Sequence, residues 1–252
     1  MTQRFLDKVA VVIGGNSGIG LESAKAFARE GAQVVITGRH PETLDAAIDE
    51  IGHGAVAYRS DVSDVSQIRS TFSDIRQRFT CIDVLFVNAG ILTISTIESV
   101  TEADWDAVQN VNLKGAFFSM QAALALMPKG SSMVLTGSTA GCQGMPTASV
   151  YAASKAGLRS LGRSFAAELI GRGIRVNVVS PGPTDTPIFQ RTGGLSSDAM
   201  QTLRQSEIDG VPMRRMGTPL EIASAVLFLA SDAAAFCTGT ELLVDGGAVN
   251  CC

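Results

Sequence analysis

Residues 9–20 read VAVVIGGNSGIG, five apolar residues followed at once by a glycine-rich segment. A run of apolar, mostly β-branched residues predicts a buried strand over 9–13. The helix predicted next, over 17–30, carries Ile19, Ala24, Phe27 and Ala28 at intervals that place them on one face. The stretch therefore predicts a strand, a tight turn and a helix in immediate succession, which is the opening unit of an α/β fold.

The same alternation continues along the chain. Further strands are predicted over residues 33–37, 55–58, 82–87, 132–136, 175–179 and 241–244. Helices are predicted from Pro41 to near Gly52, through Ile68, Phe72, Ile75 and Phe79, from Thr101 with Asp104 as its capping partner, from Tyr151 to about residue 170, and over 219–230. Seven strands alternating with about six helices predict a doubly wound Rossmann fold with a seven-stranded parallel sheet, as a single α/β domain over residues 1–252.

Length, charge and hydropathy limit the partners of the protein. The chain has 252 residues, 46% of them hydrophobic, and its 20 basic and 24 acidic side chains give a net charge of -4. Basic residues are dispersed, so the electrostatic footprint of a nucleic-acid-binding protein is missing. No segment approaches the roughly 20 apolar residues of a membrane helix, and residues 1–8 lack an apolar signal-peptide core. We expect a cytoplasmic protein that binds neither nucleic acid nor membranes.

The small number of histidines and the spacing of the cysteines exclude other chemistries. His40 and His53 are the only histidines, which leaves little for a Ser-His-Asp triad or a histidine-rich zinc site. The five cysteines form no Cys-x-x-Cys pair, so we expect reduced thiols, and the adjacent Cys251 and Cys252 receive no function. No metal site is expected.

The glycines after the first strand indicate a ligand. Gly14, Gly18 and Gly20 form Gly-x-x-x-Gly-x-Gly between the first strand and the first helix. Such a segment can simply form a tight turn without binding a ligand. At the start of a βαβ unit, however, glycines also let the backbone approach a pyrophosphate at a helix N-terminus. The loop therefore predicts dinucleotide binding.

The end of the second strand indicates which dinucleotide binds. A carboxylate there would accept a hydrogen bond from a ribose 2′-hydroxyl and repel a 2′-phosphate, but the chain has Thr37-Gly38-Arg39. A guanidinium can pair with a phosphate through its planar fork, although Arg39 can also be an ordinary exposed arginine. This segment predicts NADP(H) rather than NAD(H).

Four polar residues are candidates for catalysis. Tyr151 and Lys155 are four residues apart on a predicted helix and share one face. A phenol has an unperturbed pKa of about 10, so acid/base work near neutral pH needs nearby positive charge, which a lysine supplies. Ser138 follows the strand over 132–136, at the end where open α/β sheets bind ligands. Asn112 is a poor helix-interior residue whose side chain could hold a water, bend the helix or simply be exposed.

Together these motifs resemble the short-chain dehydrogenase/reductase family. The matching residues follow the family's order over nearly the whole chain: Gly14, Gly18 and Gly20; Asp61-Val62; Asn88-Ala89-Gly90; Asn112; Ser138; Tyr151 and Lys155; Pro181-Gly182 with Thr186; and Val244-Asp245-Gly246-Gly247. One position departs from the pattern, because Ile13 stands where the family usually has threonine. This change removes one side-chain hydrogen bond from the loop.

The resemblance implies a role for each matched residue. Tyr151 would be the general acid/base, Lys155 would lower its pKa and bind the nicotinamide ribose, Ser138 would orient the carbonyl, and Asn112 would support a proton relay. The cofactor would contact Gly14, Asn16, Ser17, Gly18, Ile19, Gly20, Arg39, Asp61, Val62, Asn88, Ala89, Gly90, Tyr151, Lys155, Pro181, Gly182, Thr184 and Thr186. A homotetramer is implied as well, with the helices of Asn112 and Tyr151 packed between subunits.

The segments after these motifs predict the substrate class. They are mostly apolar, with Ile91, Leu92, Ile94, Cys142, Met145, Pro146, Val150, Ile188 and Phe189 as candidate lining residues, although some could instead pack against the scaffold. Residues 181–197 are the longest irregular stretch, which predicts a mobile substrate lid near 181–210. An apolar wall favours a hydrophobic ketone or aldehyde. We expect an NADPH-dependent carbonyl reductase that forms an alcohol reversibly.

Three alternatives stay open. A 3-oxoacyl-thioester reductase of fatty-acid synthesis shares fold, cofactor and catalytic residues, and Lys129, Arg172 and Arg175 could form the basic surface that docks its acidic carrier protein, or be solvated charges. A sugar or polyol dehydrogenase is the second. The third is a non-catalytic NADP-binding regulator, which would tolerate loss of the tyrosine or the lysine, whereas this chain has both.

Overall fold

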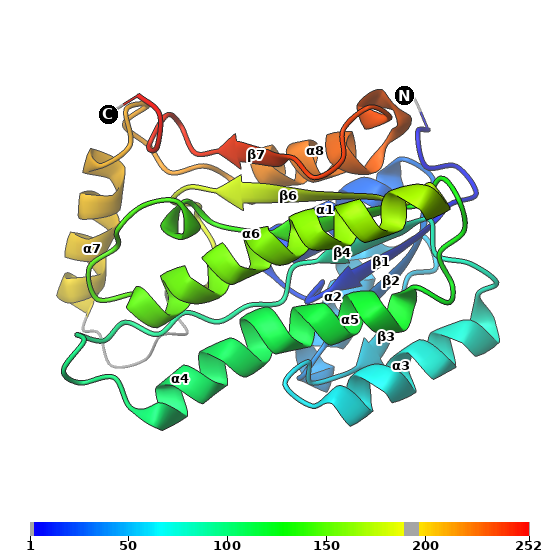
Figure 1. Ribbon diagram of the computed structural model, residues 1–252, viewed down its shortest axis with the longest axis horizontal. Helices are drawn as coiled ribbons and strands as arrows, with labels where there is room; N and C mark the ends of the chain where they lie inside the picture. Colours follow the sequence, from blue (N-terminus) through cyan, green and yellow to red (C-terminus); the bar gives the residue numbers. More distant parts are fainter. Residues whose placement is uncertain (1–2, 189–196, 252) are drawn as a thin grey trace.

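The computed structural model describes residues 3–188 and 197–251. In this part of the chain a seven-stranded parallel sheet is covered by helices on both faces (Figure 1). The doubly wound α/β fold predicted from the sequence is confirmed. None of the described helices is long and apolar enough to cross a bilayer.

The order of the strands decides where a ligand can bind. The strands are β1 (Val9–Ile13), β2 (Gln33–Gly38), β3 (Val56–Arg59), β4 (Val84–Val87), β5 (Ser132–Thr136), β6 (Arg175–Pro181) and β7 (Glu241–Val244). They lie in the order β3-β2-β1-β4-β5-β6-β7. From β1 the chain adds β2 and β3 on one side of the sheet, and it then returns to add β4 to β7 on the other side of β1. Ligands of open α/β sheets bind at the carboxyl ends of the strands beside such a change of direction.

Both faces of the sheet are buried. In β1, Val9, Val11 and Ile13 belong to one buried apolar cluster, whereas Ala10 and Val12 belong to the other. Strands covered on both sides need apolar residues at every position. This requirement explains why the run at the start of the chain shows no alternation with polar residues.

Each face carries its own set of helices. The first cluster joins the sheet to α3 (Val65–Arg78), α5 (Ala116–Ala123) and α6 (Ser149–Leu169) through Ile75, Met120 and Leu158. The second joins it to α1 (Gly18–Arg29), α2 (Pro41–Ile51) and α8 (Pro219–Ala230) through Phe27, Leu44 and Val226. Figure 1 shows α4, α5 and α6 together on the near side of the sheet.

Two helices begin with reciprocal capping. At the start of α4 (Glu102–Gln109), the backbone N–H of Asp104 donates to Thr101 Oγ1, and its carboxylate accepts from the Thr101 N–H. Thr218 and Glu221 repeat this arrangement at α8, which covers the predicted residues 219–230. Each pair satisfies backbone donors that a helix N-terminus leaves without an intrahelical partner.

Between α4 and α5 the helical path widens into a π-helical turn over Asn110–Gly115. Gly115 permits a close contact there, because a Cβ on it would lie 2.5 Å from the carbonyl oxygen of Val62. Single π turns within helices occur often at functional positions. This one holds Asn112, which is fully buried rather than exposed.

Several elements differ from the sequence-based prediction, among them β6, β4 and α7 (Ser197–Asp209). β6 runs two residues beyond the predicted 175–179, and β4 begins at Val84 instead of residue 82. The third of these, α7, is a helix in a region where the sequence predicts only a lid. Residues 189–196, which include Phe189 and the middle of that predicted lid, lie outside the described residues.

Candidate active site

A cavity of about 930 Å³ lies at the carboxyl ends of the strands, around the change of direction between β1 and β4. Residues that follow β1, β2, β3, β4, β5 and β6 all contribute to its wall. Every residue predicted to contact cofactor or substrate carbonyl lines this cavity, apart from Gly20 and Asn112. The sequence motifs, far apart along the chain, therefore converge on one site.

The glycine loop brings backbone close to the cavity. Gly14 has a φ of 78° and Gly18 a φ of 53°, both in the left-handed region that favours glycine. A Cβ on Gly14 would lie 2.8 Å from Ala89 Cα. Gly18 begins α1, whose first N–H groups have no intrahelical acceptor. The loop thus offers donors without side chains in the way, which fits a bound pyrophosphate.

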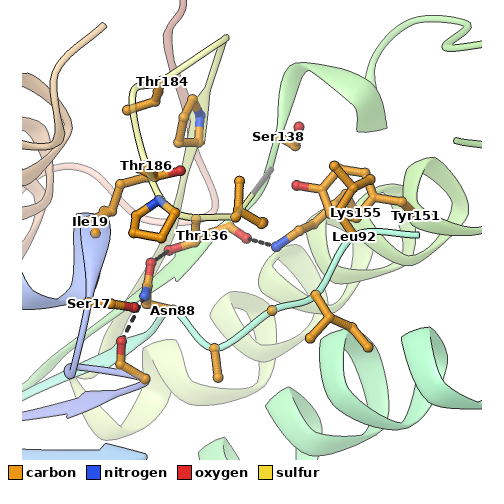
Figure 2. Close-up of a pocket in the computed structure, with 18 of the residues that line it drawn as sticks. Ser17, Ile19, Asn88, Leu92, Thr136, Ser138, Tyr151, Lys155, Thr184 and Thr186 are labelled. Carbon is orange, nitrogen blue, oxygen red and sulfur yellow. Dashed lines mark hydrogen bonds between the residues drawn. The ribbon is translucent and has the colours of Figure 1, made fainter. Parts of the chain in front are cut away.

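Gly20 contributes through packing instead of ligand contact. A Cβ on it would lie 2.0 Å from the carbonyl oxygen of Gly14 and 2.6 Å from Asn88 Nδ2. That same Asn88 amide donates to the Gly14 oxygen at 3.0 Å, and its Oδ1 accepts from Thr136 Oγ1 at 3.1 Å. Asn88 therefore joins the glycine loop to β4 and β5 (Figure 2).

The far end of the cavity surrounds the loop after β2. Asn16 Nδ2 donates to Thr43 Oγ1 at 2.8 Å, and Thr43 Oγ1 donates to the His40 carbonyl oxygen at 2.9 Å. Beside them Arg39 is exposed and lines the cavity, with no ion-pair partner among the described residues. Asp61 lines the cavity as well, and its Oδ1 accepts two hydrogen bonds from Ser63.

Lys155 is a buried ammonium with few partners. It is 3% exposed, and its Nζ donates to the Thr136 carbonyl oxygen at 2.8 Å. Burial lowers the pKa of Lys155 to about 8. An ammonium has three donors, and the described residues supply this one with a single acceptor. The remaining donors are available for an uncharged hydroxyl or an anion in the cavity, as a nicotinamide ribose would provide.

Tyr151 and Ser138 complete the reactive group of side chains. The Lys155 Nζ lies 5.6 Å from the centroid of the Tyr151 ring, and both come from α6 (Figure 2). Ser138 follows β5, and its Oγ accepts from the Ala140 N–H at 3.1 Å. Burial raises the pKa of the Tyr151 phenol, while the Ser138 hydroxyl acts in the opposite direction. A phenol, a hydroxyl and an ammonium thus face one cavity, an arrangement suited to proton transfer at a carbonyl oxygen.

Asn112 lies behind the cavity wall. Its Oδ1 accepts from the Ile91 N–H at 2.8 Å, and its Nδ2 donates to the Ile91 carbonyl oxygen at 2.9 Å and to Ser154 Oγ at 3.0 Å. These contacts use both N–H donors of the side-chain amide and provide a donor for its oxygen. Its side chain fixes the loop after β4 against α6, so in this structure Asn112 is a positioning residue.

The loop after β6 closes another side of the cavity. A Cβ on Gly182 would lie 2.8 Å from Asp245 Cα, and the Thr184 hydroxyl donates to the Gly182 carbonyl oxygen at 2.9 Å. Further on, Asp185 accepts two hydrogen bonds from Arg204 of α7, each of 2.8 Å. The described part of the predicted lid is therefore held by backbone contacts and by the bidentate ion pair between Arg204 and Asp185.

About half of the predicted apolar wall reaches the cavity. Ile91, Leu92, Met145 and Ile188 line it. Ile94, Cys142, Pro146 and Val150 do not line it, and Phe189 lies outside the described residues. Cys142 instead donates to Glu241 Oε1 at 3.3 Å. The apolar surface is thus smaller than the sequence suggests.

Thr136 and Glu207 are among the residues of the site that were not identified from the sequence. Thr136 binds both Asn88 and Lys155, and its place as the last residue of a predicted strand was a usable signal. Glu207 of α7 also lines the cavity, and no local pattern distinguishes it from other acidic residues. Among residues 3–188 and 197–251, no group of three or more His, Cys, Asp or Glu side chains is placed to hold a metal ion.

Comparison with known proteins gives the family. A family model described as enoyl-(acyl carrier protein) reductase matches residues 13–249. The 3-oxoacyl-[acyl-carrier-protein] reductase of Thermotoga maritima is 38% identical over 251 residues, covering 98% of this chain and 99% of that protein. The NADP-dependent (R)-specific alcohol dehydrogenase of Lentilactobacillus kefiri is 36% identical over 254 residues, covering 98% of each.

The fold comparison agrees with these matches. The crystal structure of levodione reductase superposes with a TM-score of 0.91 at 33% identity, covering 96% of this chain and 98% of that one. Similarity extends over nearly the whole length in each case. The chain belongs to the short-chain dehydrogenase/reductase family of oxidoreductases, which act on CH–OH groups.

Proposed function

We propose that the protein is an NADPH-dependent reductase that converts a hydrophobic ketone or aldehyde reversibly into an alcohol. The observation that carries this proposal is the convergence of Ser138, Tyr151 and Lys155 on the cavity that the glycine loop also lines. Proton transfer and dinucleotide binding would thus share one cavity. Their proximity is what a carbonyl reductase requires.

The chain's own residues can carry out the proton chemistry. Ser138 donates a hydrogen bond to the carbonyl oxygen, and Tyr151 gives that oxygen its phenolic proton. The bound nicotinamide supplies the hydride that the carbonyl carbon gains. The Tyr151 phenolate that results lies beside the Lys155 ammonium, whose charge stabilises it. Reversal of the same steps oxidises the alcohol.

The proposed preference for NADPH depends on the segment after β2. Thr37, Gly38 and Arg39 line the cavity there, and none of them is acidic. A ribose 2′-hydroxyl would find no carboxylate at this position, whereas a 2′-phosphate could pair with the uncommitted Arg39 guanidinium. The NADP-dependent relative from Lentilactobacillus kefiri supports the same choice.

The substrate class is proposed from the inner wall. Ile91, Leu92, Met145 and Ile188 offer an apolar surface next to the reactive side chains, which suits a hydrophobic carbonyl compound. A sugar or polyol would leave most of its hydroxyls without partners on such a wall.

A 3-oxoacyl-thioester reductase is the second candidate, supported by the relative from Thermotoga maritima. The basic residues expected to dock its carrier protein do not favour it. Arg172 donates to the Leu124 carbonyl oxygen, and Arg175 donates to carbonyl oxygens at the end of α8. Arg175 also begins β6, whereas the cavity lies at the carboxyl ends of the strands. Assay of a 3-oxoacyl thioester beside simple ketones separates the two candidates.

We also propose a homotetramer, as the family resemblance implies. Several large apolar side chains are exposed in the single chain and would be covered by contacts between copies, among them Trp105, Ile170, Phe228 and Phe236. Light scattering should then give a mass near four times 26.3 kDa. A monomeric mass would refute this arrangement.

Tyr151→Phe should abolish ketone reduction while leaving cofactor binding intact. The substitution removes the proton donor and little volume, and loss of a general acid costs roughly 10²- to 10⁴-fold in rate. NADPH oxidation with a panel of aryl ketones, keto esters and a 3-oxoacyl thioester measures the first effect, and cofactor fluorescence measures the second. Unchanged turnover in this variant would remove Tyr151 from the mechanism and overturn the proposal.

Arg39→Ala should reduce the preference for NADPH over NADH by roughly tenfold or more, because it removes a charged hydrogen bond to the 2′-phosphate. The ratio of kcat/KM with the two cofactors measures the preference. Arg59→Ala is the matched control, since Arg59 is exposed at the end of the neighbouring β3 and does not line the cavity. Equal ratios in the wild type and Arg39→Ala would contradict the NADPH assignment.

Lys155 should make the stability of the cofactor-free protein depend on pH. Its pKa of about 8 lies below the ordinary lysine value of 10.5, so between these two pH values the unfolded chain binds more protons than the native one. Stability from this group therefore rises with pH over that window, by at most about 1.4 kcal/mol per pH unit. Denaturant unfolding at pH 7, 8, 9 and 10 should show this rise relative to Lys155→Met. Parallel pH profiles for the two proteins would show that Lys155 has an ordinary pKa.

A further inference from the structure

Glu207 is a carboxyl group on the cavity wall that has no partner among residues 3–188 and 197–251. It comes from α7, is half-buried, and lines the cavity together with Ser206 and Gly210. No hydrogen bond or salt bridge to its side chain exists within the described part of the chain. Burial raises the pKa of Glu207. Asp61 is the other acidic residue that lines the cavity, and its carboxylate already accepts from Ser63.

The nearby arginines are committed elsewhere. Arg204 binds Asp185 through two hydrogen bonds of 2.8 Å. Arg214 donates to the Asp209 carbonyl oxygen at 2.8 Å, and Arg215 donates to both carboxylate oxygens of Glu221. None of these three arginines forms an ion pair with Glu207 in the described part of the chain. The protein thus places a carboxyl group at the cavity and directs its neighbouring cations to other acceptors.

The Arg204–Asp185 ion pair joins α7 to the loop after β6. Asp185, the partner of Arg204, donates its own backbone N–H to the Gly217 carbonyl oxygen at 2.9 Å. Arg204 and Glu207 are three residues apart on α7 and so lie on neighbouring parts of its surface. Figure 1 shows this helix standing across the carboxyl ends of β6 and β7. The ion pair to the loop after β6 therefore holds α7 with Glu207 turned toward the cavity.

An unpartnered carboxyl group in such a place has a physical cost. Polar groups withdrawn from water lose solvation that only a hydrogen bond restores, and a carboxyl group gains most from a charged or hydroxyl donor. Gln143 and Ser206 also line the cavity, but among the described residues neither forms a hydrogen bond with Glu207. A ligand that carries one would satisfy Glu207, whereas a purely apolar ligand would leave it desolvated.

We propose that Glu207 determines substrate specificity by accepting a hydrogen bond from a hydroxyl or ammonium group that the substrate carries in addition to its carbonyl. This inference rests on the proposed function and narrows its substrate class. The preferred substrate is a ketone with an apolar body and one hydrogen-bond donor. Sites built to bind a polar group discriminate strongly against analogues that lack it, because the protein group then stays unpaired.

The test compares three ketones that share one apolar body and end in a methyl, a hydroxyl or an ammonium group. For the wild type, we expect kcat/KM to favour at least one donor-bearing ketone over the methyl ketone by roughly tenfold, mainly through KM. Glu207→Leu should lose this preference. Glu207→Gln should keep a preference for the hydroxyl ketone and lose one for the ammonium ketone, which identifies the donor.

Asp209→Asn is the matched control, since it removes a carboxylate from the same helix at an exposed position that does not line the cavity. It should leave all three ratios unchanged. Thermal unfolding of each variant shows whether the fold is intact, and the isosteric Glu207→Gln provides a result even where Glu207→Leu is destabilised. Identical substrate ratios in the wild type and both Glu207 variants would overturn the inference.

Binding measurements distinguish failure of this inference from failure of the proposed function. Calorimetric titration of the same three compounds into the enzyme with NADP⁺ reports recognition without turnover. Ketone reduction without any dependence on Glu207 overturns the inference alone. Binding that depends on Glu207, without reduction of any ketone, overturns the proposed reductase and retains the role of Glu207. Absence of both turnover and selective binding overturns both.

Discussion

The side-chain amide of Asn88 connects the three segments on which the site is built. It donates to the Gly14 carbonyl oxygen in the glycine loop and accepts from the Thr136 hydroxyl at the end of β5. Thr136 in turn accepts, through its carbonyl oxygen, the hydrogen bond from Lys155. One connected set of bonds thus runs from the pyrophosphate end of the cavity to the ammonium beside Tyr151. The backbone hydrogen bonds between parallel strands would not by themselves fix the distances between these side chains, because those bonds end where the loops that carry the site begin.

The close packing of α1 follows from the same connection. Gly20 has no room for a Cβ between the Gly14 oxygen and the Asn88 amide, so the first helix approaches the sheet only because this position lacks a side chain. Lys155 depends on its surroundings in a comparable way. Its ammonium is buried with one backbone acceptor, which costs solvation and lowers its pKa. The fold tolerates that cost where the charge can stabilise a phenolate.

The sequence predicts those parts of the molecule whose physics is local. The continuous apolar runs, the capping pair at Thr101 and the Tyr151–Lys155 spacing each depend on a few neighbouring residues, and the structure contains all of them. Asn112 shows the limit of such reasoning. Its helical position indicated an unusual residue, but the partners that fix its role, Ile91 and Ser154, are brought to it only by the tertiary fold.

Glu207 marks the same limit at the substrate end. Residues 197–209 contain few apolar residues at helical spacing, so neither the helix nor its direction could be read from the pattern, and a cavity-facing glutamate resembles any exposed one. The cofactor end is different because glycines and strand ends constrain the backbone itself. In this chain the Arg204–Asp185 ion pair joins α7 to the loop after β6. Glu207 on this helix, which has no partner among the described residues, is the proposed feature by which the site distinguishes one carbonyl compound from another of similar size.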